Sequence, residues 1–290
     1  MPAYQPSNEV NPTQHLQGRC VVPLNMKKPP AWLLLLCVLV AIVGWYRLPS
    51  VPTYGGLSIE GFNYTPYNLD RFVITDDYGD TAGGGGDLMP GDGQGTLSCC
   101  YKLKGTDFTV KWDVYDADEA MKDLYAPIKM IHKTTLVHLP PTKIHGGAGE
   151  RVLGLHFYPD DHIEFEFRND MQGTRIEYDE IWGWLDRNYG KQLNPEGLDD
   201  SVVFRQTARV AANGWLKYRL TDKRDLRWYV YYVMIVNRKF DEDSAIQKIL
   251  HDTKDKPGAF GAAMAKLPQT LVDQLKSGNF ERVHTEAIHG

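Results

Sequence analysis

Residues 153–167 read LGLHFYPDDHIEFEF, and this alternation of apolar and polar side chains is typical of two strands joined by a tight turn. If residues 159–161 form a three-residue hairpin loop, six apolar side chains share one face. The facing pairs are then Leu153 with Phe167, Leu155 with Phe165, and Phe157 with Ile163. The opposite face carries His156, Tyr158, His162, Glu164 and Glu166. The sequence therefore predicts a hairpin whose polar face is a solvated surface or a partner-binding patch.

The same period of two occurs upstream of this hairpin. It is clearest at Phe108, Val110, Trp112 and Val114, which alternate with polar residues. Segments 57–60 and 97–103 show a similar pattern. Six or seven such strands without intervening helical periods predict a small antiparallel β-sandwich or barrel-like domain over residues 55–168.

Helical periodicity dominates the C-terminal half of the chain. Ser201 is expected to cap a helix whose apolar stripe is Phe204, Ala208, Ala211 and Trp215. Three further boundaries are predicted from capping residues, at Asp222, Asp243 and Gly278. The last of these lies just past a predicted helix over residues 269–276.

Residues 228–236 (WYVYYVMIV) are compatible with either a buried strand or a central helix. The capping residues before this segment and its helical neighbours favour the helix. We therefore predict an α-helical domain over residues 176–280 and a short tail at 281–290. Together with the strands, this gives an α+β fold class.

An apolar run precedes the predicted strands. Residues 31–46 (AWLLLLCVLVAIVGWY) carry no charge and would extend about 24 Å as a helix, or about 27 Å with Pro29 and Pro30 included. A bilayer core is about 30 Å thick. Trp32, Trp45 and Tyr46 lie where an aromatic belt would be. We predict a transmembrane signal anchor over residues 27–47.

Charge around this run predicts its orientation. Lys27 and Lys28 precede it and only Arg47 follows directly, so the positive-inside rule places residues 1–26 in the cytoplasm. A signal-peptide cleavage site needs small residues at both −3 and −1, and residues 41–43 and 42–44 each supply only one, so the segment is expected to be retained. The predicted location is the bacterial inner membrane, crossed once, with the bulk of the chain periplasmic. Residues 1–26 are either a disordered tail or a misassigned start, with Met26 as the initiator.

The part of the chain beyond this anchor is acidic. The whole sequence has 32 basic and 37 acidic residues, and residues 48–290 hold 28 and 36 of these, a formal charge of −8. Nucleic-acid binding needs a positive surface that contacts phosphates. We therefore predict no nucleic-acid partner. The 42% apolar content argues against global disorder.

Residues 76–95 (DDYGDTAGGGGDLMPGDGQG) contain four consecutive glycines, which impose no conformation and lose much entropy on ordering. This composition predicts a mobile surface loop. The alternative is a calcium site at Asp80, Asp87 and Asp92, although their spacing matches no calcium loop.

Cys99 and Cys100 follow this segment within a predicted strand. Adjacent side chains point to opposite faces of a strand, which predicts one buried thiol and one partly shielded thiol. The alternative is a vicinal disulfide, which fits poorly in a regular strand.

Five histidines fall within 31 residues: His132, His138, His145, His156 and His162. The hairpin would pair His156 with Glu164 and place His162 beside Tyr158, so His156, His162 and Glu164 are the weak metal candidates. Signatures of a nucleophilic active site are absent. We therefore predict no catalytic residues, no cofactor and no enzyme activity.

An ordered series of short motifs resembles the domain-of-unknown-function family 3304 over residues 55–167. The series begins with the run GLSIEGFNYT at residues 56–65, which contains Gly61, Asn63 and Thr65. It continues with Arg71-Phe72, the glycines Gly83, Gly84, Gly85 and Gly86, the pair Cys99-Cys100, Val110-Lys111-Trp112, and a closing turn with His156 and Pro159. This chain departs from the family in lacking a Trp-x-Pro-Gly stretch after the cysteines.

The C-terminal half is similar to small helical proteins of type VI secretion gene clusters. Members of family 3304 are typically membrane-anchored envelope proteins, and many are encoded beside type VI phospholipase toxins. The resemblance implies an immunity protein that neutralises a type VI secretion toxin, possibly a phospholipase, by covering it. The alternatives are a non-catalytic accessory subunit of secretion or envelope machinery and a metal-dependent hydrolase. The expected partners are a protein and the inner membrane.

Overall fold

A computed structural model describes residues 51–92, 98–147, 151–168 and 174–280 of the chain. Residues 51–290 form one compact unit. No helix among the described residues is both long enough and apolar enough to cross a membrane. The predicted anchor at 27–47, with Trp32, Trp45 and Tyr46, lies outside the described residues, as do the tails at 1–26 and 281–290.

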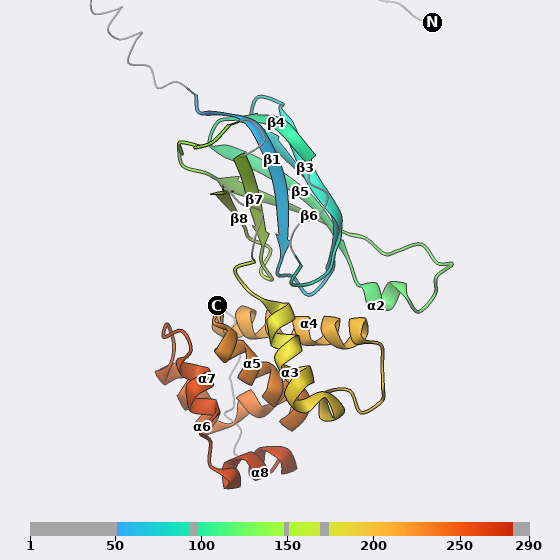
Figure 1. Ribbon diagram of the computed structural model, residues 1–290, viewed down its shortest axis with the longest axis vertical. Coiled ribbons are helices and arrows are strands. Elements are labelled where there is room, and N and C mark those ends of the chain that lie inside the picture. Colours follow the sequence, from blue (N-terminus) through green and yellow to red (C-terminus); the bar gives the residue numbers. More distant parts are fainter. Residues whose placement is uncertain (1–50, 93–97, 148–150, 169–173, 281–290) are drawn as a thin grey trace, which may run out of the picture. The chain divides into compact units, whose positions relative to one another are not determined.

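Two four-stranded sheets form the strand-rich part of the molecule (Figure 1). The first sheet has the order β4-β1-β7-β8, with β1 (Thr53–Asn63), β4 (Ser98–Lys104), β7 (Arg151–Phe157) and β8 (Ile163–Arg168). The second has the order β3-β2-β5-β6, with β2 (Asn68–Asp76), β3 (Thr81–Leu88), β5 (Asp107–Tyr115) and β6 (Ile131–His138).

Every neighbouring strand pair is antiparallel except β1 and β7. Parallel neighbours need a long crossover, and here the strands of the whole second sheet lie between β1 and β7 in the chain. The predicted α+β class with antiparallel-rich sheets is therefore confirmed.

The two sheets share one apolar core. Its residues include the predicted inward stripe of β5, namely Phe108, Val110, Trp112 and Val114, each at most 2% exposed. The alternation of apolar and polar residues along β5 thus matches burial of one face, as expected for a strand with one side against the core.

The predicted register of the β7–β8 hairpin is confirmed. Leu153 pairs with Phe167, Leu155 with Phe165, and Phe157 with Ile163. The amide of Tyr158 donates to the carbonyl of His162 at 3.1 Å, which leaves residues 159–161 as the loop. Four of the six apolar side chains are buried in the core of the strand-rich part, and Phe165 and Phe167 pack against it partly buried.

The prediction of a mobile loop over residues 76–95 is wrong, because residues 81–88 form β3 and pair with β2. The cause is the ring of Phe72. A Cβ atom on Gly84 would lie 2.8 Å from that ring, and a Cβ atom on Gly61 would lie equally close on β1. Gly85 has φ +133° and packs against the Asp70 carbonyl. The glycines therefore make room for a buried aromatic ring and a close backbone approach.

Cys99 and Cys100 form a vicinal disulfide and both are exposed, so the predicted buried and shielded thiols are wrong. The strand is not regular at this point. Leu57 pairs with Tyr101 and Ile59 with Ser98, so β4 contains one extra residue there. Cys100 also has φ +74°. This β-bulge admits the eight-membered ring that a regular strand would not.

Helices make up the rest of the described chain (Figure 1). A short helix, α2 (Ala117–Ala120), lies between β5 and β6. The helical part consists of α3 (Tyr178–Leu193), α4 (Asp200–Tyr218), α5 (Lys223–Tyr231), the π-helix η1 (Tyr232–Val236), the 3-10 helix η2 (Phe240–Glu242), α6 (Ser244–Asp252), α7 (Ala259–Met264) and α8 (Gln269–Ser277).

Side-chain caps begin several of these helices. Asp199, not the predicted Ser201, caps α4, and its carboxylate accepts from the Ser201 amide. Asp222 and Asp243 cap α5 and α6 as predicted. Gly278 follows α8 as predicted, with φ +73°, and the helix ends one residue later than expected, at Ser277. Residues 228–236 are helical as predicted, with a π-helix over the last five.

Candidate functional site

The polar face of the β7–β8 hairpin is covered by the helical part. His156 is 0% exposed and Tyr158 is 6% exposed. Trp215 of α4 stacks on the Tyr158 ring, with 5.0 Å between centroids. The hydroxyl of Tyr178 on α3 donates to the Tyr64 carbonyl at 3.1 Å. The expectation of a solvated or partner-binding surface is therefore wrong for His156 and Tyr158, because two helices pack on this face.

Both imidazole nitrogens of His156 have partners. Nδ1 lies 3.0 Å from the Tyr64 hydroxyl, and Nε2 lies 2.8 Å from Glu166. The Tyr64 hydroxyl also accepts from the Arg175 amide at 2.8 Å. A consistent assignment has Nε2–H donating to Glu166 and the tyrosine hydroxyl donating to Nδ1. His156 is thus a fully satisfied buried group.

Burial, followed by the charge of Arg175, lowers the pKa of His156 to about 4, and the bond to Glu166 only partly opposes this. The imidazole is therefore neutral at pH 7. A neutral ring whose Nδ1 accepts a hydrogen bond and whose Nε2 donates one has no free lone pair for a metal.

Arg175 ties the hairpin to the chain that leads into α3. Its guanidinium donates to the Tyr158 hydroxyl at 2.9 Å and to Glu164, and lies 3.5 Å from Glu166. Burial would raise the pKa of Glu164, but the hydrogen bond and charge of Arg175 outweigh it and hold that pKa below its ordinary value. The cluster of Tyr64, His156, Tyr158, Glu164, Glu166 and Arg175, here called the junction cluster, therefore cross-links the strand-rich and helical parts.

His162 lies at the edge of the junction cluster. Its ring stacks on Tyr158, with 4.3 Å between centroids, and its Nδ1 bonds to Asp160. Its Nε2 is 3.5 Å from Glu164. The three weak metal candidates are thus neighbours, but each imidazole has a carboxylate partner of its own. The described residues contain no group of three or more His, Cys, Asp or Glu that could hold a metal ion.

Two of the three carboxylates proposed for calcium have separate partners. Asp80 forms an ion pair with Lys104 at 2.8 Å. Asp87 accepts from the hydroxyl of Tyr115 at 2.5 Å and from Asn68 at 3.0 Å. The calcium alternative therefore finds no converging ligand set in the described chain.

The remaining residues of the family-like motifs build turns and core. The Asn63 amide donates to the carbonyls of Tyr67 and Leu88, at 2.8 and 2.9 Å, and its oxygen accepts from Thr65. Trp112 is buried and its indole N–H donates to Thr135 at 3.1 Å. Pro159 lies in the hairpin loop. These residues hold the end of β1 and the core in place.

A second region was not singled out in the sequence. The segment between β5 and β6, residues 116–130, is here called the projecting loop, and Figure 1 shows it extending from the strands beyond α2. Its large apolar side chains are exposed: Met121 58%, Leu124 80%, Tyr125 100% and Ile128 52%. The sequence feature that could have indicated this loop is the short run LYAPI at residues 124–128. The run lies among charged residues and fits neither a helical nor a strand period.

Two arginines of α4 hold the base of the projecting loop. The guanidinium of Arg209 donates to Asp116 and to Asp118, both at 2.6 Å, and also to the Pro66 carbonyl at 3.2 Å. Arg205 donates to Asp118 at 2.8 Å and is itself 5% exposed. Asp116 in addition caps α2. The base of the loop is thus tied to the helical part, while its apolar residues project.

No protein-family model, curated protein or solved structure matches this chain. The resemblance to family 3304 and to type VI secretion proteins therefore stays a prediction, and functional inference rests on the two regions described above.

Proposed function

We propose that this chain is a protein-binding protein that neutralises a secreted toxin in the periplasm, and that the toxin docks on the projecting loop. The toxin assignment and the membrane anchor rest on the resemblance and on the apolar run at residues 31–46. The observation that carries the binding role is Tyr125, which is 100% exposed beside Leu124 at 80%.

Exposed apolar side chains that lie next to one another are typical of binding surfaces. Tyrosine contributes strongly to interfaces because its ring offers a large rigid contact and its hydroxyl a hydrogen bond. Leu124 and Tyr125 are adjacent at the end of a loop, where a concave partner can enclose both. Occlusion of an active site in this way needs no chemistry from the binding protein.

The clamp by Arg205 and Arg209 supports the same role. A loop whose base is already ordered loses less conformational entropy when a partner binds. Asp116 and Asp118 are each held by guanidinium groups, so the projecting residues start from a positioned base.

The test is competition between bacteria. A strain that lacks the gene is mixed with its parent, and survival is measured after complementation with the wild-type gene, with Leu124→Ser/Tyr125→Ser, or with Tyr78→Ser. Tyr78 is a matched control because it is also an exposed tyrosine, at 55%, but lies in the turn between β2 and β3.

We expect the parent to kill the deletion strain and the loop variant, while wild type and the Tyr78 variant protect. Equal protection by the loop variant would contradict the docking site. A deletion strain that survives but no longer kills other cells would contradict the neutralising role and identify an accessory subunit of the secretion machinery.

A further inference from the structure

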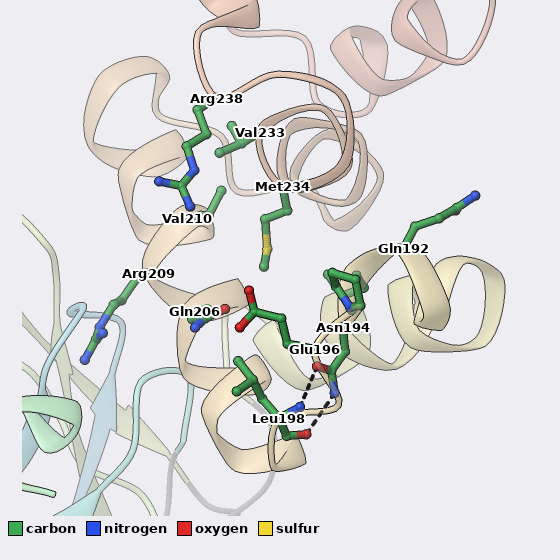
Figure 2. Close-up of a pocket in the computed structure, with 12 residues that line it drawn as sticks. Gln192, Asn194, Glu196, Leu198, Gln206, Arg209, Val210, Val233, Met234 and Arg238 are labelled. Atoms are coloured by element: carbon green, nitrogen blue, oxygen red, sulfur yellow. Dashed lines mark hydrogen bonds between the residues drawn. The ribbon is translucent and has the colours of Figure 1, made fainter. Parts of the chain in front are cut away.

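A pocket of about 650 Å³ lies in the helical part (Figure 2). The C-terminal end of α3 and the α3–α4 connection form one wall, with Glu196 and Leu198. Helix α4 contributes Gln206 and Val210, and the π-helix contributes Val233 and Met234. A volume of this size is within the range of small-molecule sites.

Aliphatic side chains form the floor of this pocket. Val210, Val233 and Met234 line it together, and the Met234 sulfur is oriented by the Thr207 hydroxyl at 3.7 Å. Val233 and Met234 belong to the π-helix, whose wider turn is closed by the bond from the Asn237 amide to the Tyr232 carbonyl at 2.8 Å. Such turns are rare in proteins, and many of those that do occur are found at functional sites.

Several polar side chains that line the pocket have no partner. Among the described residues, the side chains of Gln192, Glu196, Gln206 and Arg238 have neither a hydrogen bond nor an ion pair, and of these Gln192 extends away from the other three in Figure 2. By contrast, Asn194 is used by its own turn, because its side chain bonds to the amide and carbonyl of Leu198. In Figure 2 the Glu196 carboxylate and the Arg238 guanidinium both turn toward the space beside Val210 and Met234.

The unpaired groups define the chemistry of a ligand. A carboxylate attracts an ammonium group, and a guanidinium matches a carboxylate in a two-bond geometry. The amide of Gln206 both donates and accepts, as a peptide bond requires. The aliphatic floor favours apolar side chains. A zwitterionic peptide of two or three residues with apolar side chains has all four of these features.

We propose that this pocket binds short zwitterionic apolar peptides, with Glu196 at the peptide's ammonium group and Arg238 at its carboxylate. The proposal does not rest on the toxin partner proposed above. Neither Glu196 nor Arg238 belongs to the projecting loop or its clamp, although the clamp residue Arg209 also lines the pocket.

The direct test is calorimetric titration of the full-length protein, held in lipid nanodiscs, with the dipeptide Leu-Leu. N-acetyl-Leu-Leu amide, which lacks both charges, is the matched probe. We expect Leu-Leu to bind at least about tenfold more tightly than the capped probe, because each end loses a charge-assisted hydrogen bond. Equal affinity for the two probes, or no heat from Leu-Leu at millimolar concentration, would overturn the proposal.

Variants then assign the two ends. Glu196→Gln and Arg238→Met are each expected to weaken Leu-Leu binding at least about tenfold. Asp186→Asn and Arg187→Met are the controls, because both residues are exposed on α3 and outside the pocket. Binding that survives both pocket variants, or that the controls reduce equally, would contradict the assignment.

A second measurement does not depend on the charge variants. In a methyl spectrum of methionine-labelled full-length protein, Leu-Leu should shift the Met234 resonance, assigned with Met234→Leu. Met264, which is buried and 1% exposed, should not move. A shift at Met264 with none at Met234 would overturn the site.

Discussion

The junction cluster and the projecting loop differ in which side chains they bury and which they expose. The junction cluster buries polar groups, with His156 at 0% exposure, and satisfies them with hydrogen bonds. The projecting loop exposes apolar groups, with Tyr125 at 100%, while its charged base is paired. The difference teaches that the buried imidazole of His156 has a structural role, whereas the exposed side chains of the projecting loop include large apolar groups.

The largest expected effect comes from replacing His156. His156→Leu leaves the Glu166 carboxylate without its imidazole partner and removes the acceptor of the Tyr64 hydroxyl, so we expect a loss of about 3 kcal/mol in the free energy of unfolding. Urea unfolding followed by tryptophan fluorescence measures this. His132→Leu is the control, because that side chain is 72% exposed and should change stability little. If both variants lost the same free energy of unfolding, the distinction between the buried His156 and the exposed His132 would be wrong.

The stability of the wild-type protein at acid pH tests the same histidine without a substitution. The folded pKa of His156, about 4, lies below its ordinary value of 6.5. Between these values the unfolded chain binds a proton that the folded chain does not, so stability falls as pH falls from 6.5 to 4. Over the whole range from pH 6.5 to pH 4, the expected loss in the free energy of unfolding is about 3 kcal/mol.

Urea unfolding at several pH values measures this slope. His156→Leu should lose the part of it that lies between pH 6.5 and 4. A variant with the same slope as wild type would show that other groups cause it.

Breaking the clamp of the projecting loop should have a smaller effect. Arg209→Met removes the bonds to Asp116 and Asp118, and because these side chains are only partly buried we expect a loss of about 1 to 2 kcal/mol. Hydrogen exchange over residues 121–128 should become faster. Arg187→Met, on the exposed face of α3, should change neither quantity. Unchanged exchange in the Arg209 variant would show that the clamp does not order the loop.

The smallest expected effect is at the end of the loop. Leu124→Ser/Tyr125→Ser should leave the Tm nearly unchanged, because Leu124 stays 80% exposed and Tyr125 100% exposed in the folded chain. Thermal unfolding measured by circular dichroism checks this. A clear drop in Tm would mean that the two residues pack against other parts of the chain, and the contrast with the junction cluster would fail.

Local sequence patterns predicted much of the secondary structure. The hairpin register follows from a loop of three residues, because a two-residue loop would mix the two faces. Asp222 and Asp243 begin helices because their carboxylates satisfy free amides of the first turn. The glycines of β3 led to the wrong prediction of a mobile loop, because composition alone does not reveal the Phe72 ring packed against them.

By itself, the sequence determined which side chains share a face: the alternation in β5 and in the β7–β8 hairpin assigns each residue to one side. Only the tertiary structure decided which faces are covered. His156 is buried because α3 and α4 pack on the polar side of the hairpin, and Tyr125 is exposed because nothing in the described chain covers the projecting loop. Alternation is a property of consecutive residues, whereas burial depends on contacts between segments distant in the chain.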